Sequence, residues 1–142
     1  MSKFFEYFKE NMDGLGLPCP ESLFATQALA VQTVKTLIEY VEKYGPRTLV
    51  RDLVGAGTRL EKLGLYATGG VAFYTGAVIG SLAVATGRTL AGGTSIAEVL
   101  SIARQSHINT PWLPAMLQRY PGFVNPQIGT RKMYRYAARP HR

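Results

Sequence analysis

The side chains that could act as acids, bases, nucleophiles or metal ligands are few in this chain and lie far apart. It contains one cysteine, Cys19, and two histidines, His107 and His141, so we expect neither a cysteine–histidine dyad nor a zinc site. The carboxylates are scattered, and no pair of them suggests acid–base catalysis. The G-A-G sequence at 55–57 lacks the lysine of a phosphate-binding loop. We therefore predict that the protein is not an enzyme and holds no metal and no cofactor.

The single cysteine excludes an internal disulfide, and it stands between Pro18 and Pro20. The flanking prolines indicate a rigid entry into a helix, and we expect an inert thiol there rather than a nucleophile. The N-terminal sequence MSKFFEYFKENMDG carries acids and lacks the apolar core and cleavage site of a secretory signal. We expect the protein to be made in the cytoplasm, so that any membrane outside it is reached through a dedicated delivery system.

The net charge of +7 comes entirely from the C-terminal part of the chain. Residues 1–98 contain nine cations and nine acids, whereas residues 99–142 contain seven cations and no acid. Anionic lipid attracts such a tail with about 1 kcal/mol per cation near the surface, and nucleic-acid phosphates attract it as well. The cations predicted to contact membrane or phosphate are Arg131, Lys132, Arg135, Arg139 and Arg142. Tyr134 and Tyr136 suit a membrane interface or base stacking, and a solvated tail without a partner is the alternative.

The stretch from Leu63 to Gly87 contains no charged residue. As an α-helix it would be about 37 Å long at about 1.5 Å per residue, enough to cross a hydrocarbon core of about 30 Å with some tilt. Its small residues recur at steps of three and four, which places them in one stripe along a helix. These residues are Gly69, Ala72, Gly76, Gly80, Ala83 and Gly87. A bulky stripe on another face consists of Val71, Tyr74, Val78 and Leu82.

A glycine inside a helix costs about 1 kcal/mol relative to alanine, so this stripe needs a compensating interaction. Close packing of a second helix is that interaction, because small residues let two backbones approach. We therefore interpret residues 63–87 as a glycine-zipper helix and a candidate membrane-inserting segment that associates with copies of itself or with a neighbour. Three alternatives remain: a buried helix of a soluble bundle, a set of buried turns, or a helix shortened to 71–87 by Gly69-Gly70.

The apolar spacing predicts further helices around this stretch. Residues 3–12 form an amphipathic helix that packs on the protein's own core or lies on a membrane interface. Residues 20–44 form one packing helix, which Pro20 opens and Gly45-Pro46 stops. Shorter helices are expected over 47–62, over 95–108 behind a capping box, and over 110–121.

These elements predict an all-α fold, a small helical bundle around the glycine-rich apolar helix. A helical hairpin of residues 63–87 with the helix after Ser95 is one arrangement of its centre. The helical domain is expected to cover residues 1–124. Residues 125–142, which show no apolar period, form an extended basic tail.

A small helical body, no signal peptide and one glycine-rich spanning helix together resemble the small pore-forming effectors that bacteria deliver into rivals by type VI secretion. The resemblance covers mainly residues 63–93, and Gly76 and Gly80 match the zipper motif best. It implies a toxin that oligomerises in the inner membrane of the target cell and collapses its ion gradients. The implied partners are membrane lipid, other copies of the chain, a secretion tube or chaperone protein, and an immunity protein.

Under this hypothesis, polar side chains of the stretch help to line a narrow ion path: Thr68, Thr75, Ser81 and Thr86. The soluble form would bury the stretch under the helix at 20–44 and the helix after Ser95. Leucine at Gly76 or Gly80 is then expected to abolish leakage while the soluble fold stays intact. The alternative function is a soluble all-α interaction module that binds an acidic partner or nucleic acid through its basic tail. A passive membrane subunit of a larger complex is a third hypothesis.

Overall fold

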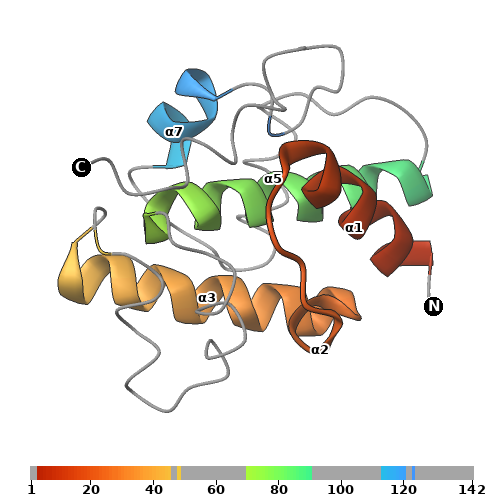
Figure 1. Ribbon diagram of the computed structural model, residues 1–142, viewed down its shortest axis with the longest axis horizontal. Coiled ribbons are helices and arrows are strands. Elements are labelled where there is room, and N and C mark those ends of the chain that lie inside the picture. Colours follow the sequence, from red (N-terminus) through yellow and green to blue (C-terminus); the bar gives the residue numbers. More distant parts are fainter. Residues whose placement is uncertain (1–2, 46–47, 49–69, 91–112, 121–122, 124–142) are drawn as a thin grey trace.

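The structure is a computed structural model that describes residues 3–45, 48, 70–90, 113–120 and 123. Its regular elements are helices (Figure 1): α1 Lys3–Leu15, α2 Glu21–Phe24, α3 Gln27–Tyr44, α5 Val71–Leu90 and α7 Leu113–Arg119. The predicted all-α class is confirmed for these residues. The helices predicted at 47–62 and 95–108, the hairpin partner after Ser95 and the basic tail at 125–142 lie outside the described residues.

Helix α5 lies at the centre of the described part of the chain (Figure 1). It contacts α1, α3 and α7, and every residue from Val71 to Ala83 is buried. The predicted bounds of 63–87 are wrong for this helix, which begins at Val71, directly after the non-helical Gly70, and continues to Leu90. Its first backbone amide, that of Val71, donates to the carbonyl oxygen of Thr48 at 2.8 Å. Among the described helices, none has both the length and the apolar character required for a membrane span.

Helix α1 presents the apolar face that its sequence predicts. Phe5, Phe8, Met12 and Leu15 are buried on this face, at the three- and four-residue spacing of one helix side. The helix continues to Leu15, beyond the residues 3–12 predicted for it, because Gly16 and not Gly14 adopts the left-handed conformation, with φ at 72°. The amide of Leu17 then donates to the carbonyl of Met12 at 3.0 Å, which closes the helix with a Schellman-type cap.

The prediction of one continuous helix over residues 20–44 is wrong. Helix α2 ends at Phe24, and α3 begins only at Gln27. Thr26 separates the two helices as the N-cap of α3: its backbone is extended, and its Oγ1 accepts from the amide of Leu29 at 3.2 Å. A threonine side chain that satisfies a backbone amide stabilises a new helix start, and the apolar spacing does not reveal it.

Helix α2 stays fastened to α3 despite this break. The Thr33 hydroxyl donates to the carbonyl of Leu23 at 3.0 Å and is within hydrogen-bond distance of the Leu29 carbonyl at 2.9 Å. At its other end α3 stops as predicted, at Gly45, whose φ is 98° and whose amide donates to the Val41 carbonyl at 2.8 Å. Helix α7 likewise confirms the short helix expected between 110 and 121.

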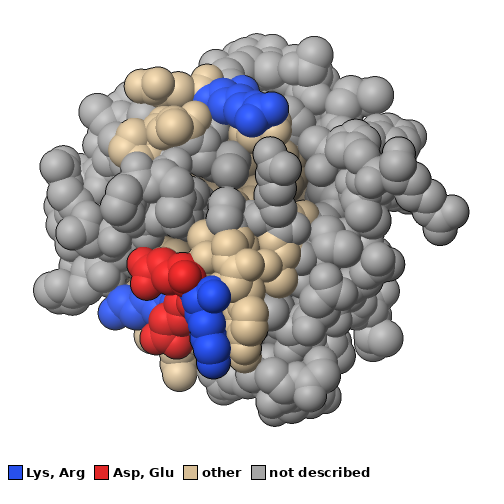
Figure 2. All heavy atoms as spheres, turned by 90° about the vertical axis from the view of Figure 1, so that its left-hand side faces the viewer, with Lys and Arg blue, Asp and Glu red and all other residues tan. Residues whose placement is uncertain are grey.

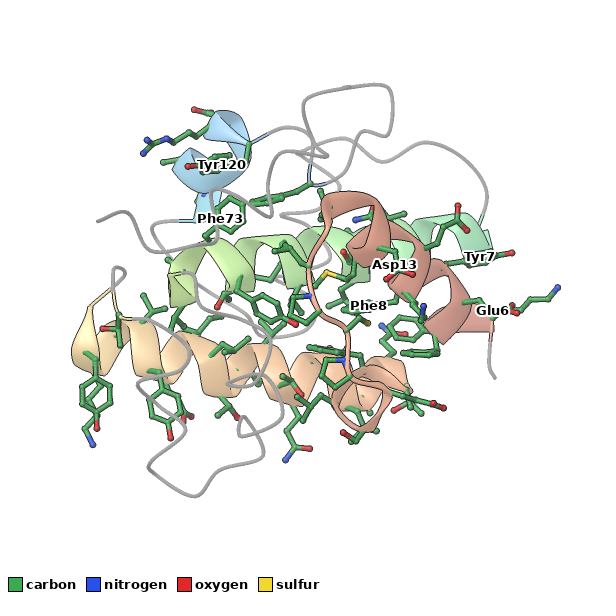
Figure 3. All side chains as sticks on the ribbon, viewed as in Figure 1. Glu6, Tyr7, Phe8, Asp13, Phe73 and Tyr120 are labelled. Carbon is green, nitrogen blue, oxygen red and sulfur yellow. The ribbon has the colours of Figure 1, made fainter. Side chains whose placement is uncertain are left out.

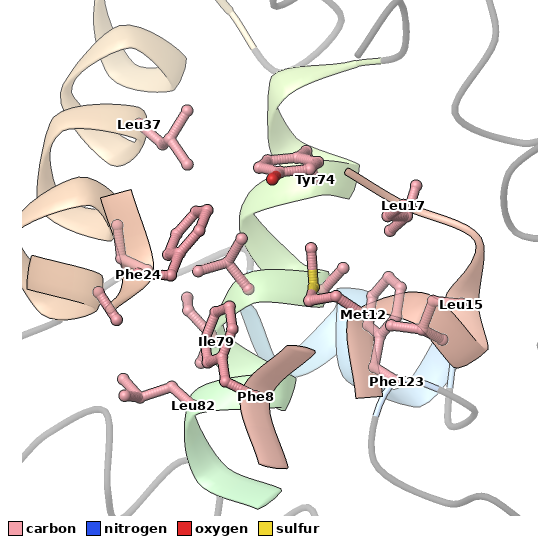
Figure 4. Close-up of a cluster of buried hydrophobic side chains, with 14 of the residues drawn as sticks. Phe8, Met12, Leu15, Leu17, Phe24, Leu37, Tyr74, Ile79, Leu82 and Phe123 are labelled. Atoms are coloured by element: carbon pink, nitrogen blue, oxygen red, sulfur yellow. The ribbon is translucent and has the colours of Figure 1, made fainter. Parts of the chain in front are cut away.

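The core of the described residues is formed by side chains from α1, α2, α3 and α5 that meet in one cluster (Figure 4). Phe8 of α1 stacks on Phe24 of α2 with ring centroids 4.9 Å apart. Leu37 of α3 and Ile79 and Leu82 of α5 belong to the same buried cluster. The sheath of α5 is therefore formed by α1 as well as by the predicted α3.

Candidate functional site

The predicted zipper residues that the structure describes lie in α5. Four of them are buried: Ala72, Gly76, Gly80 and Ala83. Gly87 belongs to the same helix, whereas Gly69 lies outside the described residues, as does Thr68 from the predicted pore-lining set. The predicted membrane- and phosphate-contacting cations of the tail also lie outside the described residues: Arg131, Lys132, Arg135, Arg139 and Arg142.

Two hydroxyl groups of the predicted pore-lining set, those of Thr75 and Ser81, form hydrogen bonds inside the fold. The buried Thr75 donates from Oγ1 to the carbonyl of Val71 at 2.6 Å, within its own helix. The buried Ser81 accepts a hydrogen bond at Oγ from Asn11 of α1 at 2.8 Å. Thr86 is half-buried farther along α5. Their role in lining an ion path stays a prediction for an inserted state.

Asn11 forms a buried polar joint that the sequence analysis missed. Its side chain is 6% exposed, and its Nδ2 donates to Ser81 Oγ and to the carbonyl oxygen of Phe123, each at 2.8 Å. A side-chain amide nitrogen carries two hydrogens, so one group can serve both acceptors. The available signal was its position: Asn11 follows Phe8 by three residues and precedes Leu15 by four, which places a polar residue inside the apolar stripe of α1.

An aromatic cluster joins the first turn of α5 to the end of α7. The Phe73 ring lies 5.0 Å from that of Tyr120 at an interplanar angle of 87°, and 5.2 Å from that of Phe123 at 68°. Figure 3 shows Phe73 and Tyr120 facing each other between the two helices. Edge-to-face pairs of this kind add about 0.5–1.5 kcal/mol to the burial of the rings. Residue 123 therefore belongs to the core around α5.

The hydrogen bonds that α5 forms with Asn11 of α1 and with Pro18 lie opposite its small-residue stripe. Successive helical residues are about 100° apart around the axis, so Ser81 lies about 140° from Gly76. Tyr74, whose hydroxyl donates to the carbonyl of Pro18 at 2.5 Å, lies about 160° from Gly76 by the same geometry. Helix α1 and the segment that follows it are therefore held by polar contacts on the face away from the stripe.

The thiol of Cys19 lies half-buried between α1 and α2. Burial raises its pKa to about 12, and the carboxylate of Asp13 adds to this rise, while the Lys9 ammonium opposes it. Because only the thiolate is a good nucleophile, this cysteine is chemically inert near neutral pH, as its sequence context indicates.

We expect Cys19 to react with iodoacetamide at pH 8 at least about 100-fold more slowly in the folded protein than in urea, because an unfolded thiol titrates near about 8.5. The native rate should keep rising with pH beyond 10, where the unfolded rate has levelled off. Mass spectrometry of the alkylated protein measures both rates. Equal rates in the folded and unfolded protein would contradict the raised pKa.

The described charged side chains do not gather into a metal site or a basic patch. Among the described residues, no group of three or more His, Cys, Asp or Glu side chains could hold a metal ion. On the face shown in Figure 2, the described acids lie directly beside cations. The exposed pair of Lys9 and Asp13, 2.8 Å apart on α1, shows the same mixture of signs.

Comparison of the chain with protein-family models, with curated proteins and with solved structures finds no match. The arguments on function below therefore start from the geometry around α5.

Proposed function

We propose that this protein is a pore-forming antibacterial toxin of the type VI effector kind that its sequence resembles. It keeps α5 inside a sheath of amphipathic helices. At the inner membrane of the target cell it inserts the uncharged stretch 63–87, associates with other copies and dissipates ion gradients. The observation that carries this proposal is the complete burial of α5 from Val71 to Ala83, in a helix that carries a continuous small-residue stripe.

The stripe supports a role beyond folding. The side-chain hydrogen bonds described above that reach other segments come from Tyr74 and Ser81, which lie off the stripe, whereas Phe73 lies beside it, about 20° from Gly80. Glycines within a helix cost about 1 kcal/mol each relative to alanine. Close approach of a second helix in a membrane would offset that cost, because small residues increase the packing contacts between neighbouring helices.

The hydrogen bonds of α5 favour its transfer into lipid. The hydroxyl of Thr75 already bonds to the carbonyl one turn earlier, and this bond moves with the helix. The hydroxyl of Ser81 loses only its bond from Asn11 and can bond to its own helix in the same way. Backbone groups stay satisfied because the helix supplies its own hydrogen bonds.

The experiment is potassium release from vesicles of phosphatidylethanolamine and phosphatidylglycerol. Leucine at Gly76 or Gly80 is unsuitable, because both glycines are buried and overpacking a core costs about 1–3 kcal/mol. The double variant Gly76→Ala, Gly80→Ala instead adds two methyl groups to the stripe. We expect wild type to release potassium and the double variant to release it at least fivefold more slowly, since its helices pack less closely.

The control is Gln32→Ala on the exposed side of α3, which should release potassium at the wild-type rate. Circular dichroism establishes that all three proteins are folded. Equal release by wild type and the double variant would remove the stripe from the mechanism. A folded wild type that releases no potassium would contradict the pore and favour the alternative, a module that binds nucleic acid or an acidic partner through its basic tail.

A further inference from the structure

We infer that α1 is a detachable cover of α5, which opens as a unit on a hinge at Gly16 and is held closed by its apolar face and by the hydrogen bonds of Asn11. The assignment of an opening unit rests on contacts within the fold alone. Its role in exposing α5 to a membrane rests on the proposed function.

The closed state depends on an apolar face and one polar joint. Phe8 and Met12 of α1 point into the cluster that contains Ile79 and Leu82 of α5 (Figure 4). Asn11 adds the hydrogen bonds to Ser81 and Phe123, residues 70 and 112 positions away in sequence. One side-chain amide therefore links the N-terminal helix, the central helix and the segment after α7.

The boundary of the opening unit follows from the contacts on either side of it. Beyond α1, the carbonyl of Pro18 is bound by the hydroxyl of Tyr74 on α5, and α2 is bound to α3 through Thr33. Residues from Pro18 onward are thus fastened independently of α1. Gly16 lies between α1 and this fastened segment, and its φ of 72° marks a glycine with wide conformational freedom.

Opening of α1 does not leave the Asn11 amide buried without hydrogen-bond partners. In the closed state the amide of Asn11 is buried with both acceptors in place, and a variant that removes it leaves buried acceptors without this donor, which is costly. In the open state the Asn11 amide returns to water, and the Ser81 hydroxyl can bond to its own helix. Both the apolar face of α1 and the Asn11 amide therefore favour the closed state, and loss of the amide shifts the equilibrium toward the open state.

The test is amide hydrogen exchange of the full chain, followed by mass spectrometry of peptides from α1, α3 and α5. In wild type at low guanidinium concentration, α1 is expected to exchange before α3. Asn11→Ala should raise exchange in α1 at least tenfold and leave α3 within twofold of wild type. Glu6→Gln, an exchange on the exposed side of α1, is the matched control and should change neither helix.

Equal acceleration in α1, α3 and α5, or none in α1, would overturn the hinge. If Asn11→Ala fails to fold, Ser81→Ala removes one acceptor only and should produce a smaller acceleration confined to α1. The hydrogen-exchange results involve no membrane and stand whether or not the protein forms pores. In the vesicle assay Asn11→Ala should leak at least threefold faster than wild type. An open α1 with unchanged leakage would overturn its role as a cover, and a wild type without leakage would overturn the pore alone.

Discussion

Replacement of Phe8 with alanine is expected to lower the free energy of unfolding by about 3–5 kcal/mol, the range for a buried phenylalanine. The Phe8 side chain is 0% exposed. Its ring stacks on Phe24 at a centroid distance of 4.9 Å and lies 5.8 Å from that of Phe4. Alanine would leave a cavity at the place where α1, α2 and α5 meet. The surrounding side chains of a packed core relax only partly into such a space.

Urea denaturation followed by circular dichroism measures this change. The control is Lys35→Ala on the exposed side of α3, where a change of no more than about 0.5 kcal/mol is expected. A loss below about 1 kcal/mol for Phe8→Ala would mean that α1 contributes little to the core, against the packing described above. Hydrogen exchange of the same variant should show the largest acceleration in α1.

Replacement of Phe123 with alanine is expected to cost a similar amount, about 3–5 kcal/mol. Its side chain is 0% exposed, and its ring contacts Phe73 at 5.2 Å and Tyr120 at 5.5 Å. The variant removes the ring that holds the segment after α7 against α5. The Phe123 carbonyl that accepts from Asn11 then loses its fixed position, so part of the loss is expected to appear as faster exchange in α1.

The same urea denaturation measures this effect, with Gln118→Ala on the exposed side of α7 as the control that should change the stability by no more than about 0.5 kcal/mol. An unchanged stability of Phe123→Ala would place residue 123 outside the core. It would also contradict the three-segment joint at Asn11, because that joint requires residue 123 to be held against α5.

The sequence by itself determined the helical class and much of the local structure. The apolar spacing of residues 3–12 was enough to predict α1, since a repeat of three to four residues puts Phe5 and Phe8 on one side of a helix. Gly45 was enough to predict the end of α3, because a residue with a positive φ is most easily a glycine. The predicted zipper function, the pore-lining hydroxyls and the basic tail are not decided by this structure and stay predictions.

The tertiary structure alone decided how these helices meet. Thr26 divides the helix predicted over 20–44, because its hydroxyl caps a backbone amide and so competes with continued helix formation. Asn11 binds residues 70 and 112 positions away, and no local spacing encodes such a pairing. The hydrogen bonds at Ser81 and Tyr74, to Asn11 of α1 and to Pro18, lie opposite the small-residue stripe. A helix period defines its faces, but only packing in three dimensions determines which neighbour covers each face.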